Sequence, residues 1–203
     1  MTLAVALIDL QRDFISVDGA YARGGVTSPV IATLPSRLRP LVEAARTAGV
    51  VVIASQFTLT PVGEGEPIIA PELHRLRPFL GRGDFCPGTP GHGLVDEIGS
   101  VDVSVEKVAY SAFHQSRLEW ILRGLGVERL LVGGIVTNGG VASTVRDAHT
   151  RGFAPTLIAD GCAAFGTDAH DATVRSLATV LPTTTIAEAR QTLLELAQTG
   201  CHR

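Results

Sequence analysis

A strand and a helix follow one another across a glycine-rich turn in Arg129-Leu-Leu-Val-Gly-Gly-Ile-Val-Thr-Asn-Gly-Gly-Val-Ala-Ser-Thr-Val-Arg-Asp-Ala148. The apolar residues at its start predict a buried strand over 129–133. The helical spacing of Val141, Val145 and Ala148 predicts a helix over 139–151. Units of this kind favour a parallel sheet, because the helix returns the chain to the edge where the next strand begins.

The same alternation runs through the rest of the chain. Further strands are predicted over 3–8, 50–54, 101–108, 154–159 and 183–186. Further helices are predicted over 37–48, 116–123, 168–179 and 187–198. This order predicts one α/β domain over 1–203, with a parallel sheet and helices on both faces. The segments 58–71 and 78–93 hold most of the prolines and little periodicity, which predicts functional loops or lids.

The composition excludes several classes of protein. The chain has 203 residues, of which 45% are hydrophobic and 18% charged, and its formal net charge is −3. That charge favours neither a nucleic acid nor an anionic membrane as a partner. No apolar run approaches the roughly 20 residues of a membrane span. The cysteines Cys86, Cys162 and Cys201 form no spaced framework, which predicts a cytoplasmic protein.

Three places at the predicted carboxyl edge of the sheet could carry chemistry, since ligands of parallel sheets bind at that edge. Asp9 follows the first strand, and burial there would raise its pKa and suit it to proton transfer. The alternative is that Asp9 caps a helix or loop by binding backbone N–H groups. Lys107 ends the third strand and either pairs with Asp9 or extends to solvent. The turn 133–140 offers backbone N–H groups to a carboxylate or an oxyanion, or is simply a tight turn.

Several motifs occur together in one order, namely Asp9-x-Gln11-x-x-Phe14, Pro87-Gly-Thr-Pro-Gly91, Lys107 before Tyr110-Ser-Ala-Phe113, Gly134-x-x-Thr137-Asn-x-Gly140-Val-x-x-Thr144-x-x-Asp147-Ala148, and Asp160-Gly-Cys-Ala-Ala164. Over residues 3–186 the chain resembles the isochorismatase-like hydrolase superfamily. The resemblance implies a three-layer α/β/α sandwich on a six-stranded, mostly parallel, Rossmann-like sheet. It also implies a small-molecule substrate, no cofactor, and a homo-oligomer, either a dimer or a tetramer.

Most members of that superfamily are amidohydrolases with an Asp-Lys-Cys triad, and the resemblance assigns Asp9 and Lys107 to its first two positions. The third position is Gly140, which cannot form a covalent acyl intermediate. Cys86 and Cys162 follow no turn that would offer an oxyanion hole, and we expect both to be packing residues. Cys201 lies in the C-terminal tail.

Glycine at this position also resembles the true isochorismatases, which cleave a vinyl ether. Protonation of an enol-ether carbon gives an oxocarbenium ion that water captures without a protein nucleophile. We therefore expect acid-catalysed hydrolysis of isochorismate or a similar carboxylated substrate, with Asp9 as proton donor and Lys107 as carboxylate ligand. Val136 stands where an isochorismatase would have an aromatic residue, and this departure favours an alternative. The alternative is an amidohydrolase of small amide, carbamoyl or ureido substrates whose cysteine is lost or engineered away. The other alternative is an inactive small-molecule-binding homologue.

The resemblance also places a set of residues in the substrate pocket, namely Gln11, Phe14, Gln56, Tyr110, Phe113, Val136, Thr137 and Gly139. It predicts no metal site, because the Asp-x-His motif of nicotinamidase-type relatives is replaced here by Ser55-Gln56-Phe57. Among the arginines, Arg12 and Arg82 are candidate ligands of a substrate carboxylate. Arg75 and Arg77 are predicted to belong to solvated faces or helix caps.

Overall fold

The fold is built on one six-stranded sheet, described over residues 2–200 of a computed structural model. The strands are β1 (Thr2–Ile8), β2 (Val51–Phe57), β5 (Val103–Lys107), β6 (Val127–Ile135), β7 (Ala154–Ala163) and β8 (Thr183–Thr184). Their order is β5-β2-β1-β6-β7-β8, and each neighbouring pair is parallel. The predicted α/β class and parallel sheet are confirmed.

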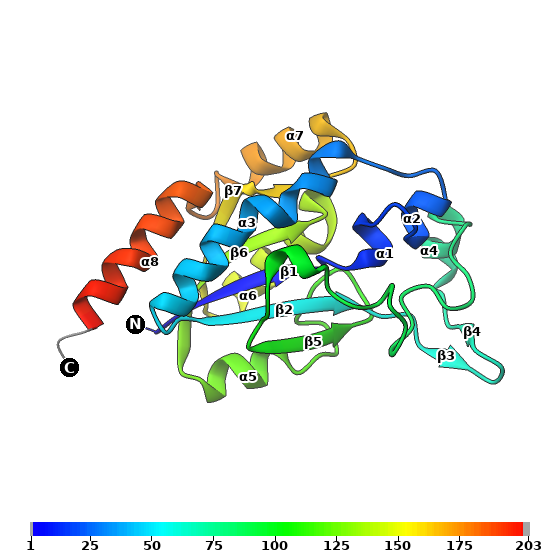
Figure 1. Cartoon of the computed structure of the whole chain (residues 1–203), viewed down its shortest axis with the longest axis horizontal. Coiled ribbons are helices and arrows are strands. Elements are labelled where there is room, and N and C mark those ends of the chain that lie inside the picture. The colour runs from blue at the N-terminus through cyan, green and yellow to red at the C-terminus, as the bar shows by residue number, and fades with distance from the viewer. Residues whose placement is uncertain (1, 201–203) are drawn as a thin grey trace.

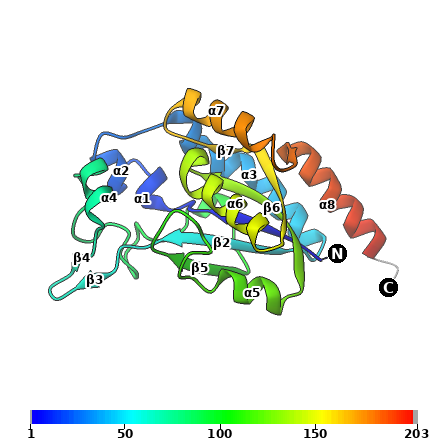
Figure 2. The same ribbon diagram turned by 180° about the vertical axis from the view of Figure 1, so that it is seen from behind.

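Helices cover both faces of this sheet (Figures 1 and 2). The helices α3 (Pro29–Thr47) and α8 (Ile186–Gly200) pack on one face, and α5 (Leu118–Gly124), α6 (Ala142–Thr150) and α7 (Thr167–Leu177) pack on the other. In β1, Leu3, Val5 and Leu7 point to the first layer, while the alternate residues point to the second. The three-layer sandwich is therefore confirmed.

Most predicted boundaries differ from the observed ones by three residues or fewer, and two differ by more. Helix α3 begins at Pro29 rather than at residue 37. The prediction started too late because Pro35 and Pro40, which lie within the helix, interrupt the helical pattern of the sequence. Ser28 caps this helix by accepting a hydrogen bond from the Ile31 N–H group. Strand β7 continues to Ala163, so that Cys162 lies inside the strand rather than beyond it.

The structure has several short elements that the sequence did not predict, most of them at the carboxyl edge of the sheet (Figure 1). They are α1 (Arg12–Ile15), α2 (Ala20–Arg23), the hairpin β3 (Pro61–Val62) and β4 (Glu66–Pro67), α4 (Pro71–Leu76) and the single turn η1 (Asp96–Ile98). Elements this short hold too few residues to show a period. Residues of α1, α2 and α4 and of the loops beside them form a small aromatic cluster, while Ile98 of η1 packs in the layer of α3. Within residues 2–200, no helix combines the length and the apolar character needed to cross a bilayer.

Candidate active site

Asp9 occupies a special backbone position directly after the central strand β1. Its φ angle is +55°, in the left-handed region, which Asp tolerates better than most residues. Its N–H group donates to the carbonyl of Ser55, at 3.1 Å, at the end of the neighbouring strand. The side chain is turned inward, since only 3% of the residue is exposed.

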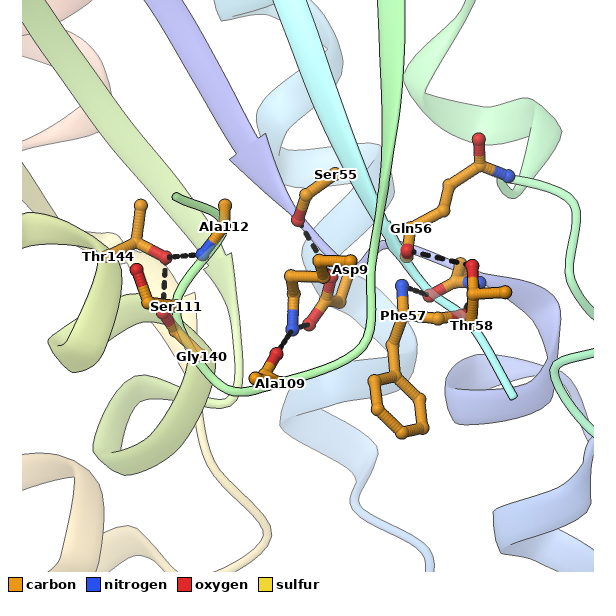
Figure 3. Close-up of polar contacts among 12 residues, drawn as sticks. Asp9, Ser55, Gln56, Phe57, Thr58, Ala109, Ser111, Ala112, Gly140 and Thr144 are labelled. Atoms are coloured by element: carbon orange, nitrogen blue, oxygen red, sulfur yellow. Dashed lines mark hydrogen bonds and ion pairs between the residues drawn. The ribbon is translucent and has the colours of Figure 1, made fainter. Parts of the chain in front are cut away.

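Lys107 and Asp9 form a buried ion pair at the centre of the site; Figure 3 labels Asp9 and its hydrogen-bond partner Ser55. The Lys107 Nζ atom lies 2.7 Å from Asp9 Oδ2 and donates a second hydrogen bond, of 2.8 Å, to the Ala109 carbonyl. Ser55 Oγ donates to Asp9 Oδ1 at 2.7 Å. Each carboxylate oxygen thus accepts a hydrogen bond from a separate donor, which is the pattern of an ionised carboxylate.

Gly140 completes this group from the turn that follows β6. The peptide bond Ile135–Val136 is cis, and the chain then enters a single π-helical turn, η2 (Thr137–Val141). A Cβ atom at Gly140 would lie 3.1 Å from Asp9 Oδ2. The three residues that the sequence assigned to the catalytic centre are therefore brought together at one point.

Thr144 fixes the turn against the segment after β5. Its Oγ1 atom donates to the Gly140 carbonyl at 2.7 Å and accepts from the Ala112 N–H group at 3.0 Å (Figure 3). Tyr110 in the same segment is 59% exposed, and its ring lies against Gly139, where a Cβ atom would be 3.3 Å away. Tyr110 and Gly139 therefore lie against each other, next in sequence to Ala109 and Gly140, and their place in a substrate pocket stays a prediction.

The two predicted glutamines have different surroundings. Gln11 is fully buried. Its side-chain Nε2 donates to the carbonyls of Phe57 and His92, and its Oε1 accepts from the Phe57 N–H group. It fastens the end of β2 to the loop that contains His92. Gln56 is half-buried and donates to the same His92 carbonyl at 2.9 Å. A substrate contact by either glutamine stays a prediction.

The remaining predicted residues divide between the site and the core. Phe14 is half-buried and packs in the aromatic cluster, 4.5 Å from the ring of Phe85. Val136 is half-buried at the start of η2, and Thr137 is buried with its Oγ1 2.8 Å from His170 Nδ1. Phe113 lies instead in the core layer beneath the sheet, against Phe153.

Folding shifts the pKa values of two other buried side chains, His92 and Cys162. Burial lowers the pKa of His92, and the negative charges of Glu106 and Asp13 oppose that shift. The ring of His92 contacts Thr58 Oγ1 through Nε2, at 2.8 Å. Burial raises the pKa of Cys162 to about 12, so that its thiol is a packing group rather than a nucleophile. Cys201 lies outside the described residues.

Sequence reasoning missed two kinds of residue. Ser55 could have been found from strand alignment, because it pairs with Ile8 and so stands beside Asp9. Tyr21 could not, because it comes from a short element whose position depends on how the loops fold. Arg77, predicted to lie on a solvated face or at a helix cap, is the C-cap residue of α4. Over the part of the chain that the structure describes, no three His, Cys, Asp or Glu side chains gather closely enough to hold a metal ion.

The family model of the isochorismatase domain matches residues 3–188. The chain belongs to the isochorismatase family. Among curated relatives of this isochorismatase-like hydrolase, the ureidoacrylate amidohydrolase RutB of Caulobacter vibrioides (strain ATCC 19089 / CIP 103742 / CB 15) is 30% identical over 178 residues, covering 82% of this chain and 79% of the relative. RutB of Stutzerimonas stutzeri is 33% identical over 172 residues, covering 77% and 68%.

Solved structures agree on the fold of this isochorismatase-like hydrolase. A cysteine hydrolase from Pseudomonas syringae pv. phaseolicola superimposes with a TM-score of 0.81 and 26% identity, covering 96% of this chain and 93% of that structure. The relatives that carry an activity in their names are hydrolases, and the present chain is a hydrolase of the same family. The amidohydrolase names among them favour the second expectation from the sequence over the first.

Proposed function

We propose that this protein hydrolyses the C–N bond of a small ureido or carbamoyl substrate, with water in the place of a cysteine thiol. The observation that supports this proposal most is the hydrogen bonding of the Asp9 carboxylate. Its two oxygens accept hydrogen bonds from Ser55 and Lys107, and Oδ2 lies 3.1 Å from the position that a Cβ atom of residue 140 would occupy. A carboxylate held in this way is suited to accept a proton from a nucleophile beside it.

In the proposed reaction, a water molecule above Gly140 attacks the carbonyl carbon of the substrate. Asp9 takes a proton from this water as the C–O bond forms, and it returns the proton to the leaving nitrogen as the C–N bond breaks. Lys107 orients the Asp9 carboxylate. Over residues 2–200 its Nζ has two oxygen partners, the Asp9 carboxylate and the Ala109 carbonyl, which leaves one N–H for the substrate.

Vinyl-ether hydrolysis remains the second candidate, and Gly140 is the observation that favours it. That reaction needs no nucleophile from the protein but requires Asp9 to enter as an acid. Two donors to the carboxylate suit the ionised form instead. Pyruvate release from isochorismate, abolished in Asp9→Asn, would establish this second function in place of the first.

The test of the proposed function compares ammonia release from N-carbamoyl amino acids by five proteins, the unaltered one and four variants. Slow turnover by the unaltered chain should disappear in Asp9→Asn, because the amide cannot accept the proton, and should persist in Asp168→Asn, an exposed residue of α7. Asn tolerates the left-handed backbone of position 9 and keeps the size of Asp, so this variant should fold.

Gly140→Cys should raise the rate by about 100-fold or more, because a thiol beside Asp9 provides covalent catalysis. The new Cβ would need neighbours to move only slightly, since it would lie 3.1 to 3.2 Å from Asp9, Ile135 and Ile8 atoms. Gly140→Ala controls for this crowding and should be inactive or slower. Ammonia release in neither the unaltered protein nor Gly140→Cys would overturn the proposal.

A further inference from the structure

His92 joins the segments at the carboxyl ends of strands β1, β2 and β5. The residue is 6% exposed, and its carbonyl accepts hydrogen bonds from the side-chain amides of Gln11 and Gln56, both at 2.9 Å. Its ring contacts Thr58 Oγ1 through Nε2, at 2.8 Å, and the Thr58 N–H group donates to the Lys107 carbonyl at 2.9 Å. A buried loop histidine is therefore linked through one residue to the main chain of Lys107.

The residues His92, Thr58 and Gln56 complete a circuit of hydrogen bonds. Gln56 Nε2 lies 3.5 Å from His92 Nδ1, and an amide nitrogen can only donate, so Nδ1 is the acceptor and the ring proton is on Nε2. His92 Nε2 then donates to Thr58 Oγ1, which donates its own proton to the main-chain carbonyl of Gln56 at 3.3 Å (Figure 3). Each residue thus donates to the next, and the contact between the ring and Thr58 is the shortest of the three.

Protonation of the His92 ring would open this circuit. A hydrogen on Nδ1 would face the side-chain N–H of Gln56, and two donors cannot bond each other. The Gln56 amide cannot turn over to present its oxygen, because its nitrogen already donates to the His92 carbonyl. The circuit therefore requires the neutral form of His92.

The surroundings of His92 favour that neutral form. Burial lowers the pKa of the ring, while the charges of Glu106 in β5 and Asp13 in α1 oppose this shift. The other two members of the circuit, Gln56 and Thr58, carry no charge. The ring is therefore neutral at pH 7, and in the folded protein it takes up a proton only below its ordinary pKa of about 6.5.

We propose that His92 is a positioning residue for the catalytic pair: its neutral ring holds Thr58, and Thr58 holds the main chain of Lys107 in place beside Asp9. This inference rests on the proposed function, because it takes Asp9 and Lys107 as the reacting groups. A displacement of a reacting group by about 1 Å can slow a reaction about 100-fold, so the support of Lys107 matters as much as its charge.

A second path from His92 reaches the same ammonium group. The Gln11 side chain that binds the His92 carbonyl also binds the main chain of Phe57 through both its nitrogen and its oxygen. The ring of Phe57 lies 5.4 Å from Lys107 Nζ, within the range of a cation–π interaction. The main chain and the ammonium group of Lys107 are thus both supported from His92.

The test measures kcat for ammonia release from N-carbamoyl-β-alanine at about pH 8 and about pH 5.5, on either side of the ordinary pKa of histidine. At the higher pH, His92→Leu should lower kcat and kcat/KM together by about 10- to 100-fold. Thr58→Val should cause a similar loss, because it opens the circuit at a second residue. His149→Gln, at an exposed position of α6, should match the unaltered protein at both pH values.

His92→Gln separates positioning from a general loss of structure. Its amide nitrogen can replace Nε2 as the donor to Thr58, so most of the loss seen in His92→Leu should be recovered at the higher pH. Because glutamine does not titrate, the ratio of kcat in His92→Gln to kcat in the unaltered protein should rise as the pH falls. Dividing the two rates removes the titration of Asp9, which both proteins share.

Hydrogen exchange of the Thr58 amide, followed by NMR, gives a second measurement that needs no turnover. Protection of this amide should fall in His92→Leu and return in His92→Gln, since its acceptor is the Lys107 carbonyl. Ammonia release that His92→Leu leaves unchanged would overturn the inference alone, and so would unchanged protection of Thr58 in that variant. Protection that falls and returns as expected, in proteins that release no ammonia, would refute the proposed function alone.

Discussion

The buried Asp9–Lys107 pair shows which parts of the site can be predicted residue by residue. Both residues end parallel strands, so the sequence was sufficient to place them at one edge of the sheet. Removing two charges from water costs several kcal/mol per ion, and such pairs seldom add net stability. The sequence could not indicate the hydrogen bonds that orient the pair, because these come from Ser55 and from the loop carbonyl of Ala109.

His92 should make the stability of the protein depend on pH. Its pKa is lowered by folding, so below the unfolded value of about 6.5 the unfolded chain takes up a proton that the folded protein resists. The free energy of unfolding should therefore fall as the pH falls through that value. At pH near 5.5 the loss should be about 1 kcal/mol or less.

Urea unfolding at about pH 8 and about pH 5.5 gives the free energy of unfolding at each pH. The loss of free energy between the two pH values is then compared among the proteins. His92→Gln should lose less stability between the two pH values than the unaltered protein does. His149→Gln, at an exposed position of α6, should keep the original dependence. The same dependence in His92→Gln and the unaltered protein would contradict the assignment to His92.

At the scale of elements, the passage from β6 into η2 depends on Gly134. Its φ angle is +123°, and a Cβ atom there would lie 2.2 Å from the Ile8 carbonyl oxygen in the paired strand β1. Gly134→Ala should therefore destabilise the protein by more than about 3 kcal/mol, since backbone strain and overlap with the main chain add together. Urea unfolding monitored by circular dichroism gives the difference.

Gly152 provides the matched comparison. It also has a positive φ angle, +81°, but nothing lies within 4 Å of the position that its Cβ would occupy. Gly152→Ala should cost about 1 kcal/mol, from backbone conformation alone. Similar losses for the two alanine variants would show that the close approach of β1 and β6 does not limit the residue at position 134.

Elements with a clear period were predictable, and elements defined by tertiary contacts were not. The strands β1 and β2 and the helix α6 follow directly from their apolar spacing. The start of α3 was missed because two prolines lie within that helix. The short elements α2 and α4 were missed as well, and they are the ones that position Tyr21 and Arg77.

At the scale of the whole molecule, alternation of strands and helices was enough to predict the layers of the sandwich. It was insufficient to predict the shape of the pocket, because the loops between β1 and α3 and between β2 and β5 adopt structures set by long-range contacts. Asp13 illustrates this, since its carboxylate accepts from the N–H groups of Ala20 and Phe85, 72 residues away in the second case. No local pattern in the sequence records such a contact.

The homo-oligomer implied by the family resemblance stays a prediction. We expect a dimer or a tetramer, and sedimentation velocity at micromolar concentration measures the mass directly. The chain has a mass of 21.3 kDa, so the species are well separated. A single monomeric species across the concentration range would contradict this expectation.

The position of β1 has a consequence for how the protein is made. Among the six strands of the sheet this one is synthesised first, yet it lies between β2 and β6 in the finished sheet. One of its edges must stay unpaired until residues 127–135 have been synthesised, which leaves an apolar strand open to chaperones or to aggregation. Asp9 is thus translated long before Gly140, and the candidate site cannot form until Gly140 has emerged.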